Sequence, residues 1–325
     1  MPKINILAPK ISVIIPTYNR DRFIKEAIDS VLIQDFQDYE IIVIDDGSTD
    51  NTKEIVKSLK NKKIRYFFQK NQGRSKARNR AIKLARGQYL AFLDSDDVFL
   101  PGKLTKQVKC LDEHPKIGMV YASALTMDEN GRKLRKKYRA TSSGLIYKEV
   151  AFTIPLLIIL PTVMVRKGII DRMGGFDERM HSFEDVDLWR RLSKKFPVMA
   201  ISKPLCTVRS HVDILREPPQ QLLKTIDYYV KKIFSQEKEL DWFYKRRAAS
   251  YLYFGYYNTV RINKNRRKLS YPFLARSFAY WPLGPIIYTI FSLSYKLFLI
   301  LIPQPKSRQK MRNFFKKLSK NVDYV

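Results

Sequence analysis

Three carboxylates stand close together in the run Asp94-Ser95-Asp96-Asp97. The run follows the apolar stretch Tyr89-Leu90-Ala91-Phe92-Leu93, which places it at the carboxyl end of a predicted buried strand. Like charges this close raise one another's pKa, so the cluster is costly unless a cation neutralises it. Oxygen ligands suit Mg²⁺ or Mn²⁺, and open α/β sheets bind ligands at the carboxyl ends of their strands. The run therefore predicts a metal-dependent site; an Asp/Ser turn that caps the helix after Pro101 is the alternative.

Polar residues also follow the first two predicted strands. Tyr18 comes after the first strand and Asp46 after the second, so in a parallel sheet both lie at the same edge as Asp94. Tyr18 can stack on a flat base, and the Asp46 carboxylate can accept a hydrogen bond from a ring N–H. The basic residues Arg74, Lys76 and Arg78 would face phosphates. The alternatives are a turn for Tyr18, a helix cap for Asp46 and a solvated helix face for the basic residues.

The elements that must position these side chains alternate along the first part of the chain. Apolar and β-branched runs predict strands at 11–15, 40–45, 64–68 and 88–93. Helices are predicted at 22–33, from the turn 46–50 through residue 59, and at 73–85. This alternation is typical of an α/β fold with a mostly parallel, Rossmann-like sheet flanked by helices. The section 116–212 is less regular, with one helix at 183–195. Beyond Pro218-Pro219, two helices are predicted before a break at Pro282, which gives a helical C-terminal extension.

Composition narrows the class of protein. The chain has 325 residues and a formal net charge of +30, which calls for an acidic partner such as phosphorylated ligands, an anionic membrane or nucleic acid. Its two cysteines, Cys110 and Cys206, lack metal-type spacing, which excludes a disulfide framework and fits a reducing compartment. Residues 1–10 lack the apolar core of a signal peptide, so we expect a cytoplasmic protein.

Taken together, the motifs resemble those of family 2 glycosyltransferases of the GT-A fold. The likeness covers about residues 10 to 212 in order. It is carried by Ser12-Val13-Ile14-Ile15-Pro16-Thr17-Tyr18-Asn19, Val43-Ile44-Asp45-Asp46-Gly47-Ser48-Thr49-Asp50, Asn71-Gln72-Gly73 through Ala77-Arg78-Asn79, Gly87 through Asp97, Gly174-Gly175-Phe176-Asp177-Glu178 and Glu184-Asp185-Val186-Asp187-Leu188-Trp189.

The resemblance implies a role for each matching residue. Asp185 would be the general base that deprotonates an acceptor hydroxyl, with helix capping as its alternative role. Glu184 and Trp189 would lie in the acceptor region. A divalent cation, Mn²⁺ or Mg²⁺, would be bound by Asp94, Asp96 and His211, the last from the Arg209-Ser210-His211 element. The nucleotide sugar would be held by Pro16, Thr17, Tyr18, Asp46, Arg74, Arg78, Asp94 and Ser95.

The resemblance also implies an activity. Residues 1–212 would form the catalytic domain, with a nucleotide-sugar half at about 10–115 and an acceptor half at about 116–212. The expected reaction is inverting transfer from a nucleotide-diphosphate sugar, a UDP-sugar being favoured, to a hydroxyl of a glycan or lipid-linked acceptor. Cell-envelope polysaccharide or glycolipid synthesis would be the setting. The alternatives are a basic nucleic-acid-binding protein and a sugar nucleotidyltransferase, although nucleic acid is not the expected partner because no binding motif is recognisable.

The basic C-terminal region, residues 213–325, points to a membrane surface. Its apolar run at 286–302 is shorter than the ~20 residues that span a bilayer. A helix that rests in the interface of an anionic membrane fits better, which would place the protein on the inner face of the cell membrane. A helix packed on the catalytic domain and a short true span are the alternatives. The cations that follow the run are Lys306, Arg308, Lys310, Arg312, Lys316, Lys317 and Lys320.

Overall fold

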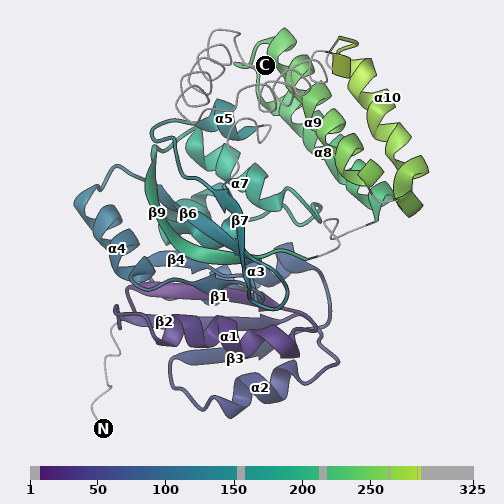
Figure 1. Ribbon diagram of the computed structural model, residues 1–325. Helices are drawn as coiled ribbons and strands as arrows, with labels where there is room; N and C mark the ends of the chain where they lie inside the picture. Colours follow the sequence, from purple (N-terminus) through teal and green to yellow (C-terminus); the bar gives the residue numbers. More distant parts are fainter. Residues whose placement is uncertain (1–7, 152–157, 212–217, 263, 284, 287–325) are drawn as a thin grey trace, which may run out of the picture. The chain divides into compact units, whose positions relative to one another are not determined.

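The computed structural model describes residues 8–151, 158–211, 218–262, 264–283 and 285–286 (Figure 1). The chain divides into two compact units. The first comprises Met1–Arg216 and Lys224–Tyr229, and the second comprises Glu217–Leu223 and Val230–Val325.

A nine-stranded mixed sheet is the framework of the first unit. Its order is β3-β2-β1-β4-β8-β6-β9-β5, with β7 paired to β6. The first four strands of this order are mutually parallel, whereas β8 runs antiparallel to both β4 and β6. The predicted mostly parallel sheet is therefore confirmed, with β8 as an antiparallel insertion. The strands are β1 (Ile11–Thr17), β2 (Tyr39–Asp45), β3 (Ile64–Phe68), β4 (Tyr89–Phe92), β5 (Val98–Phe99), β6 (Met119–Met127), β7 (Lys133–Tyr138), β8 (Val163–Arg166) and β9 (Val198–Arg209).

Helices flank this sheet, and one aspartate supports the starts of two of them. Asp50 accepts backbone hydrogen bonds from Asp21 and Thr52, both 3.0 Å, so one carboxylate satisfies the first turns of two helices. The two short helices between β6 and α7 were not anticipated. The helices are α1 (Asp21–Leu32), α2 (Thr52–Ser58), α3 (Arg74–Leu84), α4 (Lys103–Glu113), α5 (Tyr147–Ala151), α6 (Lys167–Met173) and α7 (Glu184–Ser193), with a 3₁₀ turn η1 (Leu160–Thr162).

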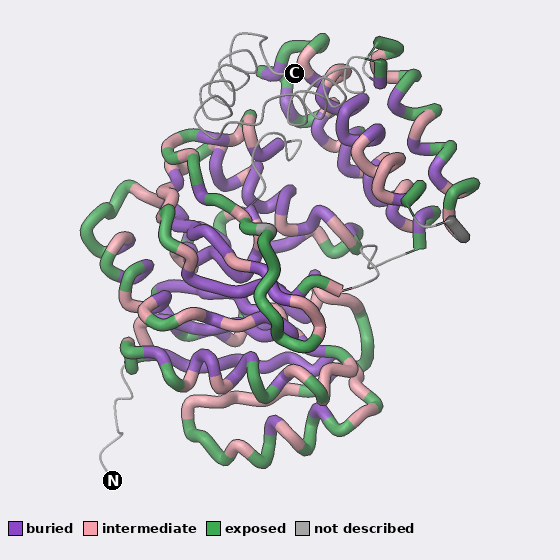
Figure 2. Tube along the Cα trace, in the orientation of Figure 1, coloured by how far each residue is buried: buried purple, intermediate pink, exposed green. Residues whose placement is uncertain are grey.

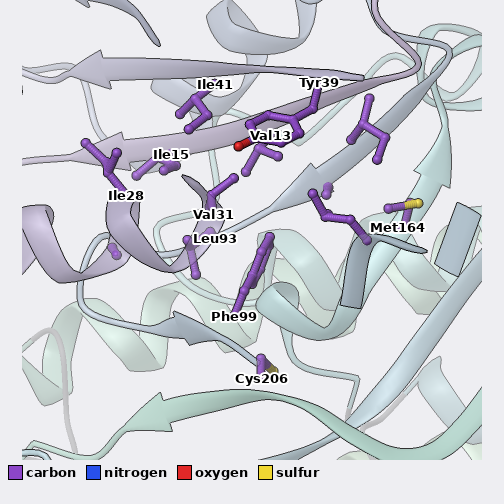
Figure 3. Close-up of a cluster of buried hydrophobic side chains, with 14 of the residues drawn as sticks. Val13, Ile15, Ile28, Val31, Tyr39, Ile41, Leu93, Phe99, Met164 and Cys206 are labelled. Carbon is purple, nitrogen blue, oxygen red and sulfur yellow. The ribbon is translucent and has the colours of Figure 1, made fainter. Parts of the chain in front are cut away.

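The hydrophobic core lies between the sheet and its covering helices. Figure 3 shows Ile28 and Val31 of α1 directed at Val13 and Ile15 of β1, and all four side chains are fully buried. Figure 2 shows that the central strands are buried, whereas the helix α2 is largely exposed. Burying an aliphatic side chain of this size contributes ~1.5–3 kcal/mol relative to leaving it exposed, so this contact holds α1 against β1.

The second unit is helical. It contains α9 (Trp242–Ile262), a 3₁₀ turn η2 (Lys264–Ser270), α10 (Tyr271–Tyr280) and the two ends of α8 (Pro219–Gln236), whose middle belongs to the first unit. The prediction of two helices over this region is wrong, since three are present. The reason is Pro272, which occupies the first turn of α10 and starts a new helix after the 3₁₀ turn.

A helix that spans a membrane must be both long and apolar. Within the described ranges, none of the helices combines the length and the apolar character that a bilayer span requires. The apolar run predicted to rest in a membrane, 286–302, lies outside the described residues apart from Ile286.

Candidate functional site

Three neighbouring parallel strands deliver the predicted site residues to one edge of the sheet. Strand β1 ends at Thr17, β2 ends at Asp45, and the acidic run follows β4. The backbone N–H of Asp46 donates to the Thr17 carbonyl (2.8 Å), which ties the first two exits together. The Tyr18 side chain is 47% exposed there, whereas the buried Thr17 Oγ1 has no hydrogen-bond partner within the described residues. This edge therefore offers both a face for stacking and an unused hydrogen-bonding group.

The Asp46 carboxylate organises the loop that leads into α3. Its Oδ1 accepts hydrogen bonds from Gln69 Nε2 (2.7 Å) and the Gln72 backbone N–H (2.9 Å), and its Oδ2 accepts from the Gly73 N–H (2.8 Å). The left-handed backbone of Gly47 lets this loop come close, because a Cβ there would lie 2.8 Å from the Asn71 nitrogen. Asp46 is therefore not a helix cap. It is a buried anchor for the loop beside Tyr18.

Arg78 joins the acidic run to the helix that carries the predicted base. Its Nη1 donates to Glu184 Oε1 (2.6 Å) and its Nη2 to Asp94 Oδ1 (2.8 Å), and the side chain is almost fully buried. Burial lowers the pKa of Arg78, but the carboxylates of Asp94, Glu184 and Asp185 outweigh that effect and raise it, so the cation is permanent. Arg78 thus lies inside the site, held by carboxylates, and is not on a solvated helix face.

Asp185 is a partly buried carboxyl group with an unusual pKa. Burial raises the pKa of Asp185 to about 7, Glu184 adds to the rise, and Arg78 opposes it. The helix α7 begins after Phe183, whose left-handed φ of 64° turns the chain sharply into the first turn. Asp185 Oδ1 accepts only the local N–H of Val186 (2.8 Å) among the hydrogen bonds that the structure defines for it. A carboxyl group near neutrality can accept a proton, which suits a general base.

Asp96 and His211 meet on the other side of the acidic run. His211 Nε2 lies 2.7 Å from Asp96 Oδ2, and His211 Nδ1 lies 3.3 Å from Glu129 Oε1. Arg20 Nε is 3.8 Å from the same Asp96 oxygen. The sequence predicted that Asp96 and His211 act together, and the fold brings them together across a separation of 115 residues.

Arg209 holds the acidic run and the end of β9 together, a role that sequence reasoning missed. Its backbone N–H donates to Asp97 Oδ1 (2.8 Å), its Nε to the Asp96 carbonyl (2.9 Å), and its Nη2 to Glu26 Oε2 (2.5 Å). Its Nη1 donates to the carbonyls of Asp128 and Glu129, each 3.2 Å away. The arginine therefore fixes His211, two residues later, relative to the acidic run. The Arg-x-His spacing was the only signal, and the partners of the arginine are too distant in sequence to infer.

The remaining predicted residues have different positions. Trp189 is fully buried and packs edge-to-face against Phe92 and Phe176, so it supports α7 from inside and does not line an acceptor surface. Glu184 is buried in its ion pair with Arg78. Pro16 and Arg74 are half-buried, and Ser95 is buried.

The alternative interpretation of the acidic run, a cap for the helix after Pro101, does not hold. The residue before α4 is Gly102, and the first-turn N–H of Leu104 donates to Gln34 Oε1 (3.3 Å), not to a carboxylate of the run. The two-residue strand β5, which pairs with β9, separates the run from α4. The carboxylates are therefore held at the strand end.

Whether the site suits a divalent cation depends on the oxygen and nitrogen atoms that could bind one. No group of three or more His, Cys, Asp or Glu side chains with metal-binding geometry is found among the described residues. Asp94 is engaged with Arg78, whereas Asp96 and His211 point one oxygen and one nitrogen at each other. Mg²⁺ in phosphate-transfer sites needs only one or two protein ligands because phosphate oxygens and water complete its shell. Asp96 and His211 offer one oxygen and one nitrogen to such a shell, and the assignment of Asp94, Asp96 and His211 as metal ligands stays a prediction.

Comparison with solved structures identifies the class. The TarS fragment 1–349 of S. aureus in complex with UDP-GlcNAc matches with a TM-score of 0.62 and 23% identity, over 85% of this chain and 81% of that chain. A mannosyltransferase of Pyrobaculum calidifontis, PcManGT in complex with GDP-Man and Mn²⁺, matches with a TM-score of 0.56 and 19% identity, over 89% and 81%. The fold is therefore GT-A-like, as the motifs predicted.

The family follows from the sequence comparison. Residues 12–172 match the glycosyl transferase family 2 model, so the chain carries a domain of that family. An uncharacterized glycosyltransferase of Rickettsia felis is 41% identical over 201 residues, which are 62% of this chain and 33% of that protein. The chain thus spans about a third of the length of this relative. The matched residues include Tyr18, Asp46, Asp94 and Asp96, and they end before Asp185 and His211.

Proposed function

We propose that the protein transfers a sugar from a nucleotide-diphosphate donor to a hydroxyl group, with inversion at the anomeric carbon. The observation that carries the proposal is the convergence of three strand ends on one edge, where Tyr18, Asp46 and Asp96 lie in the family 2 domain. TarS was solved with UDP-GlcNAc and PcManGT with GDP-Man, so both nucleotide sugars are candidate donors. We favour a UDP-sugar, as the motifs predict.

The donor would lie across the edge formed by β1 and β2. The exposed Tyr18 ring can stack on the base, and the orphaned Thr17 hydroxyl can bond the nucleotide. The Asp46 carboxylate already accepts three hydrogen bonds, so its contribution is to hold the loop 69–73 against the donor. Arg74, half-buried at the start of α3, would approach phosphate, whereas Arg78 would contribute through its two carboxylate partners.

The diphosphate end of the donor would meet the acidic run. Asp96 and His211 would hold Mn²⁺ or Mg²⁺, with Asp94 of the Asp-x-Asp pattern beside them. Such a cation, when bound, stabilises the negative charge that develops on the leaving diphosphate. Arg209 keeps His211 and the acidic run in register, which preorganises the pocket for that charge.

Asp185 would accept the proton of the acceptor hydroxyl. A hydroxyl is a poor nucleophile, so a positioned base must remove its proton as it attacks. Its pKa of about 7 suits this task near neutral pH, and Arg78 and Glu184 fix the helix turn on which it sits. A single displacement with one base gives inversion. The family 2 domain favours this activity over the nucleic-acid-binding and nucleotidyltransferase alternatives.

The acceptor and the cellular setting are also part of the proposal. We infer a glycan or lipid-linked acceptor in cell-envelope polysaccharide or glycolipid synthesis, at the inner face of the cell membrane. The support is the strongly basic C-terminal region, which favours an anionic surface.

A donor screen tests the activity. Purified protein is incubated with UDP-GlcNAc, GDP-mannose and related donors, with Mn²⁺, with Mg²⁺ or with a chelator, and release of nucleoside diphosphate is measured. We expect release from one donor class that requires the cation. The anomeric configuration of the transferred sugar, determined by NMR, then tests inversion. If no donor is turned over with either cation and a range of glycan acceptors, the proposal fails.

A further inference from the structure

The second unit has an extreme distribution of charge. The sequence contains no aspartate or glutamate between Asp241 and Asp323, although lysines and arginines recur throughout. The helices α9 and α10 and the turn η2 all fall within this stretch. The stretch therefore carries a net positive charge, which generates a positive field around it.

The two helices form a hairpin that places η2 at one end. Contacts join the first half of α9 to the second half of α10: Arg246 Nη2 donates to the Ala279 carbonyl (2.7 Å), and Ser250 Oγ lies 3.0 Å from Ser277 Oγ. Tyr253 stacks on Tyr280 with ring centroids 5.6 Å apart. The hairpin is therefore a packed element, and its connecting segment lies away from these contacts.

The connecting segment combines exposed cations with exposed apolar side chains. We call residues 261–262 and 266–272 the basic turn. Ile262 is 73% exposed and Tyr271 is 52% exposed. Arg267 and Lys268 are exposed, and neither forms an ion pair with a carboxylate among the residues that the structure describes. A monomer in water gains nothing from this combination, whereas an apolar side chain flanked by cations is typical of segments that rest on a membrane.

We propose that the basic turn docks on an anionic lipid bilayer. Arg267 and Lys268 match the negative headgroups, each cation contributing about 1 kcal/mol near such a surface, while Ile262 and Tyr271 can enter the headgroup layer. Nucleic acid fits less well, because binding of single strands relies on aromatic platforms among the cations and the turn exposes one aliphatic and one aromatic side chain. The basic turn shares no residue with the proposed sugar-transfer site.

Vesicle binding by the full-length protein tests the proposal. The probes are vesicles of phosphatidylcholine with 30% phosphatidylglycerol, and pure phosphatidylcholine vesicles. The variant R267Q/K268Q is compared with the matched control K53Q/K62Q, which removes the same charge from exposed lysines in and beside α2. We expect the turn variant to bind anionic vesicles about 30-fold more weakly, the equivalent of two lost cations. The control should stay within about twofold of the unchanged protein.

A second variant separates insertion from charge. I262S/Y271S keeps every cation, so its binding should weaken while its dependence on salt concentration stays unchanged. Circular dichroism and thermal melting establish that each variant is folded, and no donor is needed in the assay. Equal vesicle binding by R267Q/K268Q and K53Q/K62Q would overturn the proposal. A loss confined to binding of a single-stranded DNA oligonucleotide would overturn it as well, and would assign the turn to nucleic acid.

Discussion

At the scale of single residues, a substitution of Asp96 is the most direct test of the proposed metal site. Its carboxylate is buried, contacts His211, and has Arg20 nearby. We expect Asp96→Ala to abolish cation-dependent transfer while the domain stays folded, because the variant loses one of two metal donors and one of several crowded negative charges. Binding of Mn²⁺ in the presence of UDP, followed by electron paramagnetic resonance, is the direct measurement. Asp38→Ala, at an exposed position, is the control. Full activity of the Asp96 variant would contradict the assignment.

Asp185 carries a pH prediction whose sign is fixed by its environment. Burial raises the pKa of Asp185 to about 7, so the group is mostly protonated below that pH and cannot accept a proton. We expect kcat/KM to fall about tenfold per pH unit below 7 and to level off above it. Asp185→Asn should lose about 10²- to 10⁴-fold in kcat with little change in donor affinity. The exposed Asp171→Asn is the matched control. A near-normal kcat for Asp185→Asn would show that the carboxyl group is not the base.

The same pKa has a consequence for stability. A carboxyl group whose pKa is higher in the folded than in the unfolded protein stabilises the fold at low pH, and this contribution is lost as pH rises through about 7. Asp185→Asn removes that dependence. The free energy of unfolding of the variant, measured by denaturant titration, should therefore exceed that of the unchanged protein at pH 8 by more than at pH 5. A residue that only capped its helix would show the opposite, a loss of stability at pH 8.

At the scale of elements, the loop 69–73 depends on Asp46. Asp46→Ala removes the acceptor for two backbone N–H groups and one side-chain amide. We expect the free energy of unfolding to fall by about 2 kcal/mol, since some of the released N–H groups can bond to water instead. We also expect the affinity for the nucleotide sugar to fall, because the loop 69–73 is no longer held. Asp46→Asn keeps the two hydrogen bonds to Oδ1 but places an NH₂ group opposite the Gly73 N–H, which then lacks its acceptor. Its loss of stability should therefore be intermediate. Equal stability of all three proteins would show that the loop is held by other contacts.

Elements with a clear local period were predictable, and those built by distant pairing were not. The strands and helices up to α3 were placed within about two residues because hydrophobic periodicity and turn residues are local signals. The strand β5 has two residues and exists because it pairs with β9, and β8 inserts between β4 and β6, so neither leaves a local pattern. The sequence predicted two helices for the C-terminal region, whereas three are present. The third, α10, begins beside Pro272 after the 3₁₀ turn η2.

The site shows the same division. Strand-end residues such as Tyr18, Asp46 and Asp96 were predictable from parallel topology, which brings strand exits to one edge. The contacts of Arg78 were not, because a basic residue on a helix gives no sign of whether it faces phosphate or two buried carboxylates. Trp189 was placed in the acceptor region from its motif, yet the helix rotates it fully into the core.

At the scale of the whole molecule, the formal net charge of +30 is unevenly distributed along the chain. The first unit carries most of the acidic residues, and the stretch from 242 to 322 carries none. Stable attachment to a bilayer takes two signals, since one cluster or one short apolar segment binds only reversibly. The basic turn would supply one signal. The sequence of 287–325, with its apolar run and seven cations after it, would supply the other, although it lies outside the described residues.

Removal of residues 287–325 tests this arrangement. We expect the shortened protein to bind anionic vesicles much more weakly, and the remaining binding to disappear at 0.5 M salt, where the Debye length is only about 4 Å and the basic turn is screened. Adding R267Q/K268Q to the deletion should remove the remaining binding even at low salt. Sugar transfer to a water-soluble acceptor should be unchanged, since the proposed site lies in the first unit. If the shortened protein binds vesicles as tightly as the full chain, the tail is not an anchor, and the basic turn would have to act as the sole attachment.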